Sequence, residues 1–346
     1  MTHGDSEKNR SPLERFDRAA ALYLENQRYG GASEQTVKNY AGRIALFRGF
    51  WLEHHEQQPA GDPETADFRA WRNSLLDAGK KPSTVAQYLA ELRYFFEYSS
   101  DPELGTEQVY ENNPVSRRLI PKIQKRPYDE ILGNEAVAKL WHNEPPTPQL
   151  KPNWPRNYAI VVLLLTSEIR NAELLDLRLC DVNLREYYLT VESGKGGKFR
   201  TVDLPEIAVS ALKIYLQSGL RPADAPETAP LFGTDSDQSG HKNGTWHRGT
   251  SQWLSSVVER HVAAVTGVKN IRSHDLRHIG ARIDLTSGLC GLEMLQGKLG
   301  HSSPNTTQIY SGRLTSRRQT VSAREVLAAQ EEQAERNRDL IRFDIA

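Results

Sequence analysis

The first hundred residues repeat an amphipathic helical pattern four times. Apolar residues recur every three or four positions, as they do on one face of an α-helix. In the second repeat they are Val37, Tyr40, Ile44, Phe47 and Trp51. Ser11, Pro12 and Glu14 form a capping-box sequence, which predicts a first helix from residue 12. We expect the third helix to begin at Asp62, and the aromatic stripes to form a core.

Residues 111–132 interrupt this periodicity with three prolines, so the segment is predicted to be a linker. The stretch 117–126 contains no acidic residue, and its cations are suited to contacts with a phosphate backbone. They are Arg117, Arg118, Lys122, Lys125 and Arg126. The predicted organisation is a helical domain over 12–110, a basic linker over 111–132 and a second domain over 133–346.

Beyond the linker the pattern changes to mixed helices and strands. Residues 187–192 and 199–204 are predicted to be two strands joined by a turn. A long polar loop is expected over 220–249. Helices are predicted over 134–142, around 158–166, and over 171–179, 206–218, 250–266, 275–287, 292–298 and about 321–339. The expected fold class is therefore mainly α with a small β-sheet.

The composition narrows the class of protein. A chain of 346 residues with 38% hydrophobic and 25% charged residues predicts two globular domains. The longest apolar run is too short to cross a bilayer, and the amino terminus resembles no secretory signal, so we expect no membrane partner. The two cysteines lack metal-binding spacing, which predicts neither a disulfide nor a metal site.

The net charge is zero, because Lys+Arg and Asp+Glu both total 44, whereas many DNA-binding domains are basic. Charges more than about 10 Å apart are largely screened at roughly 0.1 M salt, so local clusters matter more than the total. Two clusters besides the linker are Lys195, Lys198 and Arg200, and Arg313, Arg317 and Arg318. Each cluster alone fits a solvated surface as well as a DNA contact.

Two segments place arginines where a phosphate could bind. His274 and Arg277 lie three residues apart at the predicted start of a helix capped by Ser273, and helix amino termini favour anions. Arg170 follows a buried apolar run. A buried arginine needs an anion or an acidic partner, and Glu173 could be that partner. Either segment could instead be structural.

Two further segments carry other reactive groups. Lys195 lies in the predicted hairpin turn, where a lysine ordinarily faces solvent, and the run GKGGK is not a phosphate-binding P-loop. His301 follows Leu299 and Gly300, and nine residues later comes Tyr310, one of 13 tyrosines. Neither segment indicates a function by itself.

Taken together and in this order, the four segments resemble the tyrosine recombinases, also called the phage-integrase or lambda-integrase-like family. That family has an arginine in a TGLRxSEL-like box, a lysine in a β-hairpin, HxLR, LGH and a tyrosine nine residues later. The corresponding sequences are SEIRNAELL, SGKGGKFRTVDLP, HDLRH, LGHSS and TTQIY. The family usually has glycine two residues before the first arginine. Here that residue is Glu168, which we expect to point away from Arg170.

The resemblance covers roughly residues 12–315 and implies a four-helix core-binding (SAM-like) domain before a mixed α/β catalytic domain of the DNA breaking-rejoining type. It implies a site-specific recombinase that cleaves and rejoins DNA through a 3′-phosphotyrosyl bond to Tyr310, without metal, ATP or another cofactor. Arg170 and Arg277 would stabilise the phosphate, His274 would accept the phenol proton, Lys195 would protonate the leaving oxygen, and His301 would hydrogen-bond the phosphate.

The implied partner is double-stranded DNA with short inverted repeats. The family assembles as a homo-tetramer on two sites from free monomers or weak dimers, and exchanges a carboxy-terminal segment. Residues 321–340 could be that segment or a solvated end helix. The expected location is the cytoplasm, on nucleoid DNA, and the expected origin of the protein is prokaryotic or viral. Two other functions fit the residues: a type IB topoisomerase, and a catalytically silent DNA-binding accessory protein.

Overall fold

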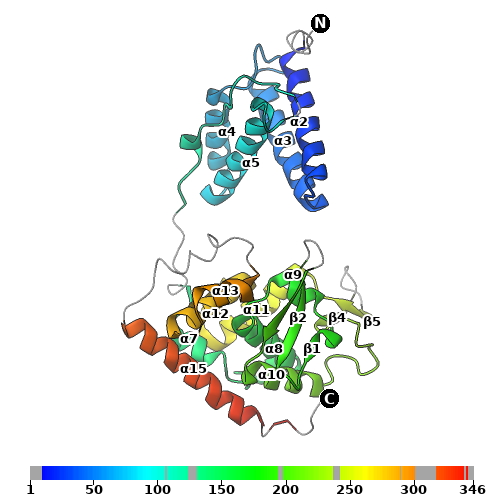
Figure 1. The fold of residues 1–346 in the computed structure, drawn as a ribbon, viewed down its shortest axis with the longest axis vertical. Coiled ribbons are helices and arrows are strands. Elements are labelled where there is room, and N and C mark those ends of the chain that lie inside the picture. Colours follow the sequence, from blue (N-terminus) through cyan, green and yellow to red (C-terminus); the bar gives the residue numbers. More distant parts are fainter. Residues whose placement is uncertain are drawn as a thin grey trace. The chain divides into compact units, whose positions relative to one another are not determined.

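The computed structural model describes residues 10–105, 107–123, 131–193, 198–236, 242–288, 290–300, 317–338 and 340–341. The chain divides into two compact units, Met1–Lys125 and Arg126–Ala346 (Figure 1). The first is helical and the second mixes helices with small antiparallel sheets, so the predicted fold class is confirmed.

The first unit has the four predicted helices. They are α2 (Pro12–Tyr29), α3 (Glu34–His54), α4 (Thr65–Asp77) and α5 (Pro82–Ser100). The capping box is confirmed: the Ser11 N–H donates to the Glu14 carboxylate at 2.8 Å, and the Glu14 N–H donates to Ser11 Oγ at 3.3 Å. The third helix begins at Thr65 and not at Asp62. The aromatic stripes form the core, where Phe47 stacks on Phe68 with ring centroids 4.1 Å apart.

The first unit extends beyond residue 110, where the sequence analysis ended it. Tyr110, Val115 and Leu119 are buried in its core, and a short 3-10 helix, η1, spans Arg117–Leu119. The Thr65 hydroxyl donates to the Pro114 carbonyl at 2.8 Å. The first half of the predicted linker therefore packs against the helices. Its apolar residues are not periodic, so the sequence pattern did not indicate that they join the helical core.

The second unit is built around a buried helix. This helix is α8 (Trp154–Thr166), in which every residue from Tyr158 to Thr166 is buried. The other α-helices are α7 (Asn134–Lys139), α9 (Asn171–Asp176), α10 (Glu206–Gln217), α11 (Ser251–Thr266), α12 (Ser273–Ser287), α13 (Leu292–Leu299) and α15 (Arg317–Arg338), with the 3-10 helices η2 (Pro148–Asn153) and η3 (Leu179–Asp181). Helices α10, α11 and α12 pack on α8.

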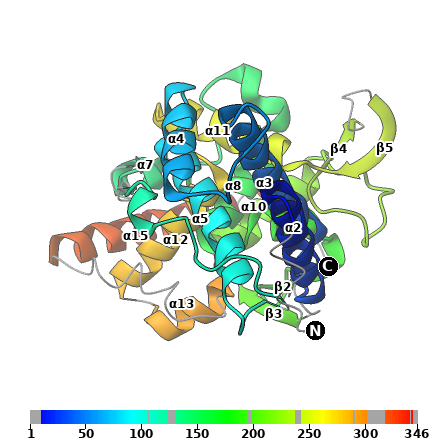
Figure 2. The same ribbon diagram turned by 90° about the horizontal axis from the view of Figure 1, so that it is seen from above.

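A three-stranded antiparallel sheet lies beside these helices, in the order β1 (Val182–Asn183), β2 (Tyr188–Ser193), β3 (Lys198–Asp203). The pairing of Ser193 with Lys198 confirms the predicted hairpin up to the residues that flank its turn. The prediction of a polar loop over 220–249 is wrong in part. This segment contains a second hairpin, β4 (Gly233–Ser236) and β5 (Lys242–Arg248), which projects from one edge of the unit (Figures 1 and 2).

Helix α15 packs along one side of its own unit, against α7, α10 and α12. Its Asn337 side chain is buried and donates to the Tyr158 hydroxyl at 3.3 Å and to Ser210 Oγ at 3.1 Å. Ala323 and Val326 on the same helix are also buried. The alternative of a solvated end helix is therefore wrong for this part of the chain.

Helices α8 and α12 approach each other closely at Gly280. A Cβ atom at this position would lie 2.0 Å from the Leu165 carbonyl oxygen, so only glycine fits there. Helix α8 leads into the turn that carries Arg170, and α12 carries His274 and Arg277. The close approach brings these two parts of the chain together.

Candidate active site

Three arginines bind the carboxyl end of α13. The last carbonyl groups of a helix have no partner within the helix. Here three successive carbonyls accept hydrogen bonds from arginines of three different elements. Arg200 of β3 binds the Lys298 carbonyl (3.3 Å), Arg277 of α12 binds the Leu299 carbonyl (2.8 Å), and Arg170 of the α8–α9 turn binds the Gly300 carbonyl (2.8 Å). The predicted arginines Arg170 and Arg277 therefore meet on adjacent peptide groups.

Arg277 is a buried arginine, with 2% of its surface exposed. Besides the Leu299 carbonyl, its guanidinium donates to the Glu168 carbonyl through Nη1. A buried charge is stable only where polar groups solvate it, and two backbone carbonyls do so here. These contacts fix the guanidinium between the α8–α9 turn and the end of α13.

Arg170 has the acidic partner that the sequence suggested and is also open to solvent. Its Nη1 atom lies 2.8 Å from Glu173 Oε1, so the acidic partner is present, yet 41% of its side chain is exposed. Glu173 also receives Nη1 and Nη2 of Arg200, each at 2.8 Å. Although burial opposes the effect, hydrogen bonds from Arg200 and from the Arg170 backbone lower the pKa of Glu173 to about 2. Glu173 is therefore an anion that holds both arginines in place.

Arg200 occupies a different environment from the one expected of a DNA contact. Only 15% of its side chain is exposed, and its guanidinium is engaged by Glu173 and by the Lys298 carbonyl. Arg200 thus binds the same carboxylate as Arg170 and is largely shielded from solvent.

His274 lies in the first turn of α12 with an exposed side chain. The helix cap is Arg272 and not Ser273 as predicted, and the Arg272 N–H donates to the Asp275 carboxylate at 2.8 Å. Desolvation and then the positive charge of Arg277 lower the pKa of His274 below its ordinary value. Both effects favour the neutral imidazole, which is the form that can accept a proton.

Glu168 lies in the turn before Arg170 with a φ of +54°, in the left-handed region that favours glycine. Its carboxylate is fully buried, and Oε1 accepts a hydrogen bond from Lys298 Nζ at 3.2 Å. The expectation that it points away from Arg170 is confirmed. Lys298 and its second partner, Asp284, were not singled out from the sequence, because they lie far from Glu168 along the chain.

Several predicted site residues lie outside the described part of the chain. They are Lys195, His301, Tyr310, Lys125, Arg126 and Arg313, together with the side chains of Lys198, Arg317 and Arg318. Arg117, Arg118 and Lys122 are described and exposed. Within the described ranges there is no group of His, Cys, Asp and Glu residues suited to a metal ion, and no helix long and apolar enough to cross a membrane.

Comparison with known proteins identifies the family. Residues 132–317, more than half of the chain, match the model of the phage integrase family, and residues 21–101 match that of the phage integrase N-terminal SAM-like domain. The chain belongs to the phage integrase family. The resemblance inferred from the four motifs is thereby confirmed, and the two family models fall on the two structural units.

Two bacterial proteins are similar to this chain over most of their length. The chain is 34% identical over 300 residues to tyrosine recombinase XerD of Pseudomonas putida, a match that covers 84% of this chain and 89% of the relative. It is 31% identical over 303 residues to tyrosine recombinase XerC of Pelobacter propionicus, with 87% and 91% covered. This chain is accordingly a site-specific tyrosine recombinase, a DNA strand-exchange enzyme. The topoisomerase and accessory-protein alternatives are not favoured.

Solved structures agree on the fold. The XerH site-specific recombinase bound to a palindromic difH substrate is 21% identical, with a TM-score of 0.58 and coverage of 85% of this chain and 81% of that one. A lambda integrase (75–356) dimer bound to a COC′ core site is 20% identical, with a TM-score of 0.58 and coverage of 85% and 96%. These likenesses show that the architecture is shared.

Proposed function

We propose that this recombinase cleaves and rejoins DNA at a short inverted-repeat site through a 3′-phosphotyrosyl bond to Tyr310. The observation that carries the proposal is the anchoring of Arg170 and Arg277 on the adjacent carbonyls of Gly300 and Leu299. The next residue along the chain is His301, the histidine of the LGH motif. Two of the six proposed catalytic residues thus bind the backbone that directly precedes a third, His301, in the sequence.

The two arginines would bind the scissile phosphate. Cleavage develops negative charge on the non-bridging phosphate oxygens, and guanidinium groups held in place before the reaction stabilise that charge. Arg170 is the more exposed of the two, and Glu173 and the Gly300 carbonyl limit its rotamers. Lysine would be a poor substitute for either arginine, because it lacks the planar fork of donors.

Tyr310 would be the nucleophile. A free phenol has a pKa of about 10, so it needs a proton acceptor and nearby positive charge to react at neutral pH. His274 is exposed, and in its neutral form it would accept the phenol proton as the Tyr310 oxygen bonds to phosphorus. The bond from phosphorus to the 5′-oxygen breaks, and Lys195 would protonate that oxygen while His301 holds the phosphate. Rejoining reverses these steps and needs no ATP, because the phosphotyrosyl bond retains the phosphodiester energy.

The proposed partner is double-stranded DNA with two inverted half-sites, bound finally as a homo-tetramer on two sites. The XerH recombinase is bound to a palindromic substrate, and the lambda integrase is bound to a core site as a dimer, which supports a symmetric target for this chain. The exposed Arg117, Arg118 and Lys122 would contact phosphates of the duplex, together with Lys125, Arg126 and Lys198. We propose that this activity takes place in the bacterial cytoplasm, on nucleoid DNA, and its similarity to bacterial recombinases supports this location.

Selection from a pool of random DNA duplexes tests the proposed target. The Tyr310→Phe chain would be used as bait, because it should bind DNA without cleaving it. The expected result is an enriched sequence with two inverted half-sites around a short centre. Enrichment of a single unrepeated motif, or of no motif, would contradict the proposed recognition of inverted repeats.

A further inference from the structure

Glu168 has an unfavourable backbone conformation and a buried carboxyl group, so other contacts must stabilise it. Its backbone is left-handed, which is unfavourable for a residue with a Cβ atom, and its carboxylate is removed from solvent. Burial raises the pKa of the Glu168 carboxyl well above its ordinary value, although the positive charge of Lys298 opposes this. Such a residue remains in a folded protein only where its surroundings hold it firmly.

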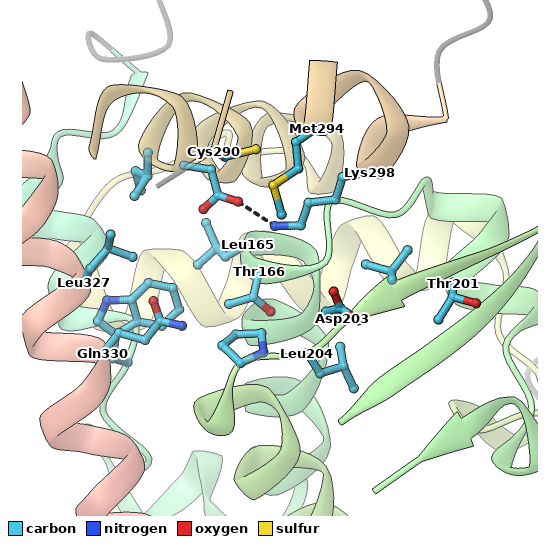
Figure 3. A pocket seen from close by; sticks show the side chains of 15 residues that line it. Leu165, Thr166, Thr201, Asp203, Leu204, Cys290, Met294, Lys298, Leu327 and Gln330 are labelled. Atoms are coloured by element: carbon cyan, nitrogen blue, oxygen red, sulfur yellow. Dashed lines mark hydrogen bonds and ion pairs between the residues drawn. The ribbon is translucent and has the colours of Figure 1, made fainter. Parts of the chain in front are cut away.

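Lys298 supplies the contact that holds Glu168. Its ammonium group lies 3.2 Å from Glu168 Oε1 and 2.6 Å from Asp284 Oδ2. In Figure 3 the Lys298 side chain reaches from α13 into a pocket of about 500 Å³, and the dashed line marks its ion pair with Asp284. One ammonium therefore joins three elements: the α8–α9 turn, α12 and α13.

The backbones of the same two residues bind the arginines of the site. The Glu168 carbonyl accepts a hydrogen bond from Arg277, and the Lys298 carbonyl accepts one from Arg200. Arg277 then connects the Glu168 carbonyl to the Leu299 carbonyl, directly beside Lys298. The α8–α9 turn and α13 are thus connected twice, once by the Glu168–Lys298 side-chain contact and once by Arg277.

We propose that Glu168, Lys298 and Asp284 are positioning residues for strand cleavage. Their ion pairs fix the end of α13 against the turn before Arg170, and so fix the carbonyls that orient the phosphate-binding guanidiniums. The inference rests on the proposed role of Arg170 and Arg277. A displacement of about 1 Å in a catalytic group can slow a reaction on the order of 100-fold, so a tether of this kind has a measurable effect on rate.

The test separates cleavage rate from DNA affinity. Each variant would be given a nicked duplex of the selected site at saturating protein, and the rate of covalent adduct formation measured, with the dissociation constant taken in a Tyr310→Phe background. Lys298→Met should slow adduct formation at least about tenfold and change the dissociation constant less than about twofold. Lys298→Arg, which can keep both ion pairs, should restore most of the rate.

A matched control is Lys139→Met, which removes an exposed lysine from its ion pair with Glu135 on α7 and should leave the rate unchanged. Thermal unfolding would establish that each variant is folded during the assay. If Lys298→Met is not folded, Asp284→Asn serves in its place. It keeps the shape of the side chain and removes the carboxylate that lies 2.6 Å from the Lys298 ammonium, and it should slow adduct formation about threefold or more.

Normal adduct formation by folded Lys298→Met or Asp284→Asn would overturn the proposal, as would a loss that appears only in the dissociation constant. Arg277→Lys is measured alongside them. If Arg277→Lys also cleaves normally, the proposed chemistry itself fails. If Arg277→Lys is inactive while Lys298→Met is normal, only the positioning role fails.

Discussion

Arg200 and Glu173 form a two-pronged ion pair, with Nη1 and Nη2 of the arginine each 2.8 Å from a carboxylate oxygen. The same carboxylate accepts hydrogen bonds from the side chain and the backbone N–H of Arg170. A single buried anion therefore organises two arginines, of which only Arg170 is substantially exposed. The stability of this arrangement depends on the charge of Glu173.

Glu173→Gln tests that dependence through pH. The pKa of Glu173 is about 2 in the folded protein, against 4.5 ordinarily. A lowered pKa contributes stability above pH 4.5 that is lost as the pH falls towards 2. At pH 7 the variant should lose roughly 1–3 kcal/mol of unfolding free energy in urea, and at pH 3 the difference should shrink. An equal difference at both pH values would contradict the assigned charge.

Gly280→Ala tests the approach of α8 and α12. The added Cβ would lie 2.0 Å from the Leu165 carbonyl oxygen, so the helices must move apart. We expect a loss of about 2 kcal/mol or more in unfolding free energy, with slower cleavage because Arg170 and Arg277 separate. Gly42→Ala in α3 is the matched control, since nothing lies within 4 Å of its Cβ, and it should keep or raise stability. Similar stability in both variants would contradict the close approach.

The local features of the fold could be predicted from the sequence. Apolar periodicity located the helices, and Ser11 with Glu14 marked the first of them, because capping and amphipathicity depend on residues only a few positions apart. The motifs around Arg170 and Arg277 are local in the same way, and they singled out two arginines as candidates for the site. The structure then brought both to the end of α13.

The remaining features depend on contacts that no local pattern reveals. The β4–β5 hairpin is polar and lacks the alternation that marks a half-buried strand, so the sequence of 220–249 predicts a loop. Arg200 lies in a basic cluster, and only the folded chain shows that it pairs with Glu173, 27 residues away. Glu168 and Lys298 are separated by 130 residues, and neither indicates the other in the sequence.

Replacing by lysine either arginine that we propose to bind phosphate tests whether the planar guanidinium donors are needed. Arg170→Lys and Arg277→Lys keep the positive charge but lose the fork that reaches both a carbonyl and the phosphate. Each should slow covalent adduct formation on the order of 10²–10³-fold, as does the loss of a donor that stabilises a developing oxyanion. Arg185→Lys, at an exposed position on the same unit, should have no effect. Wild-type rates in both arginine variants would exclude them as phosphate ligands.

The pH dependence of cleavage tests His274. Its pKa is lowered by desolvation and by Arg277, so the acid limb of the rate profile should lie below pH 6.5, the ordinary value for histidine. In the proposed mechanism the neutral ring would accept the phenol proton above that limb, and the protonated ring would not do so below it. The His274→Gln variant should cleave DNA more slowly, and its rate profile should lack this acid limb. A limb unchanged in His274→Gln would assign the titration to another group.

The most direct test of the account is to identify the residue that becomes attached to DNA. The wild-type chain would be incubated with the nicked duplex, the covalent adduct isolated in denaturing detergent, and the modified peptide sequenced by mass spectrometry. The account predicts a single phosphotyrosyl link at Tyr310, and no adduct from Tyr310→Phe despite normal DNA binding. A DNA-linked peptide from any other residue, or a detergent-resistant adduct formed by Tyr310→Phe, would contradict it.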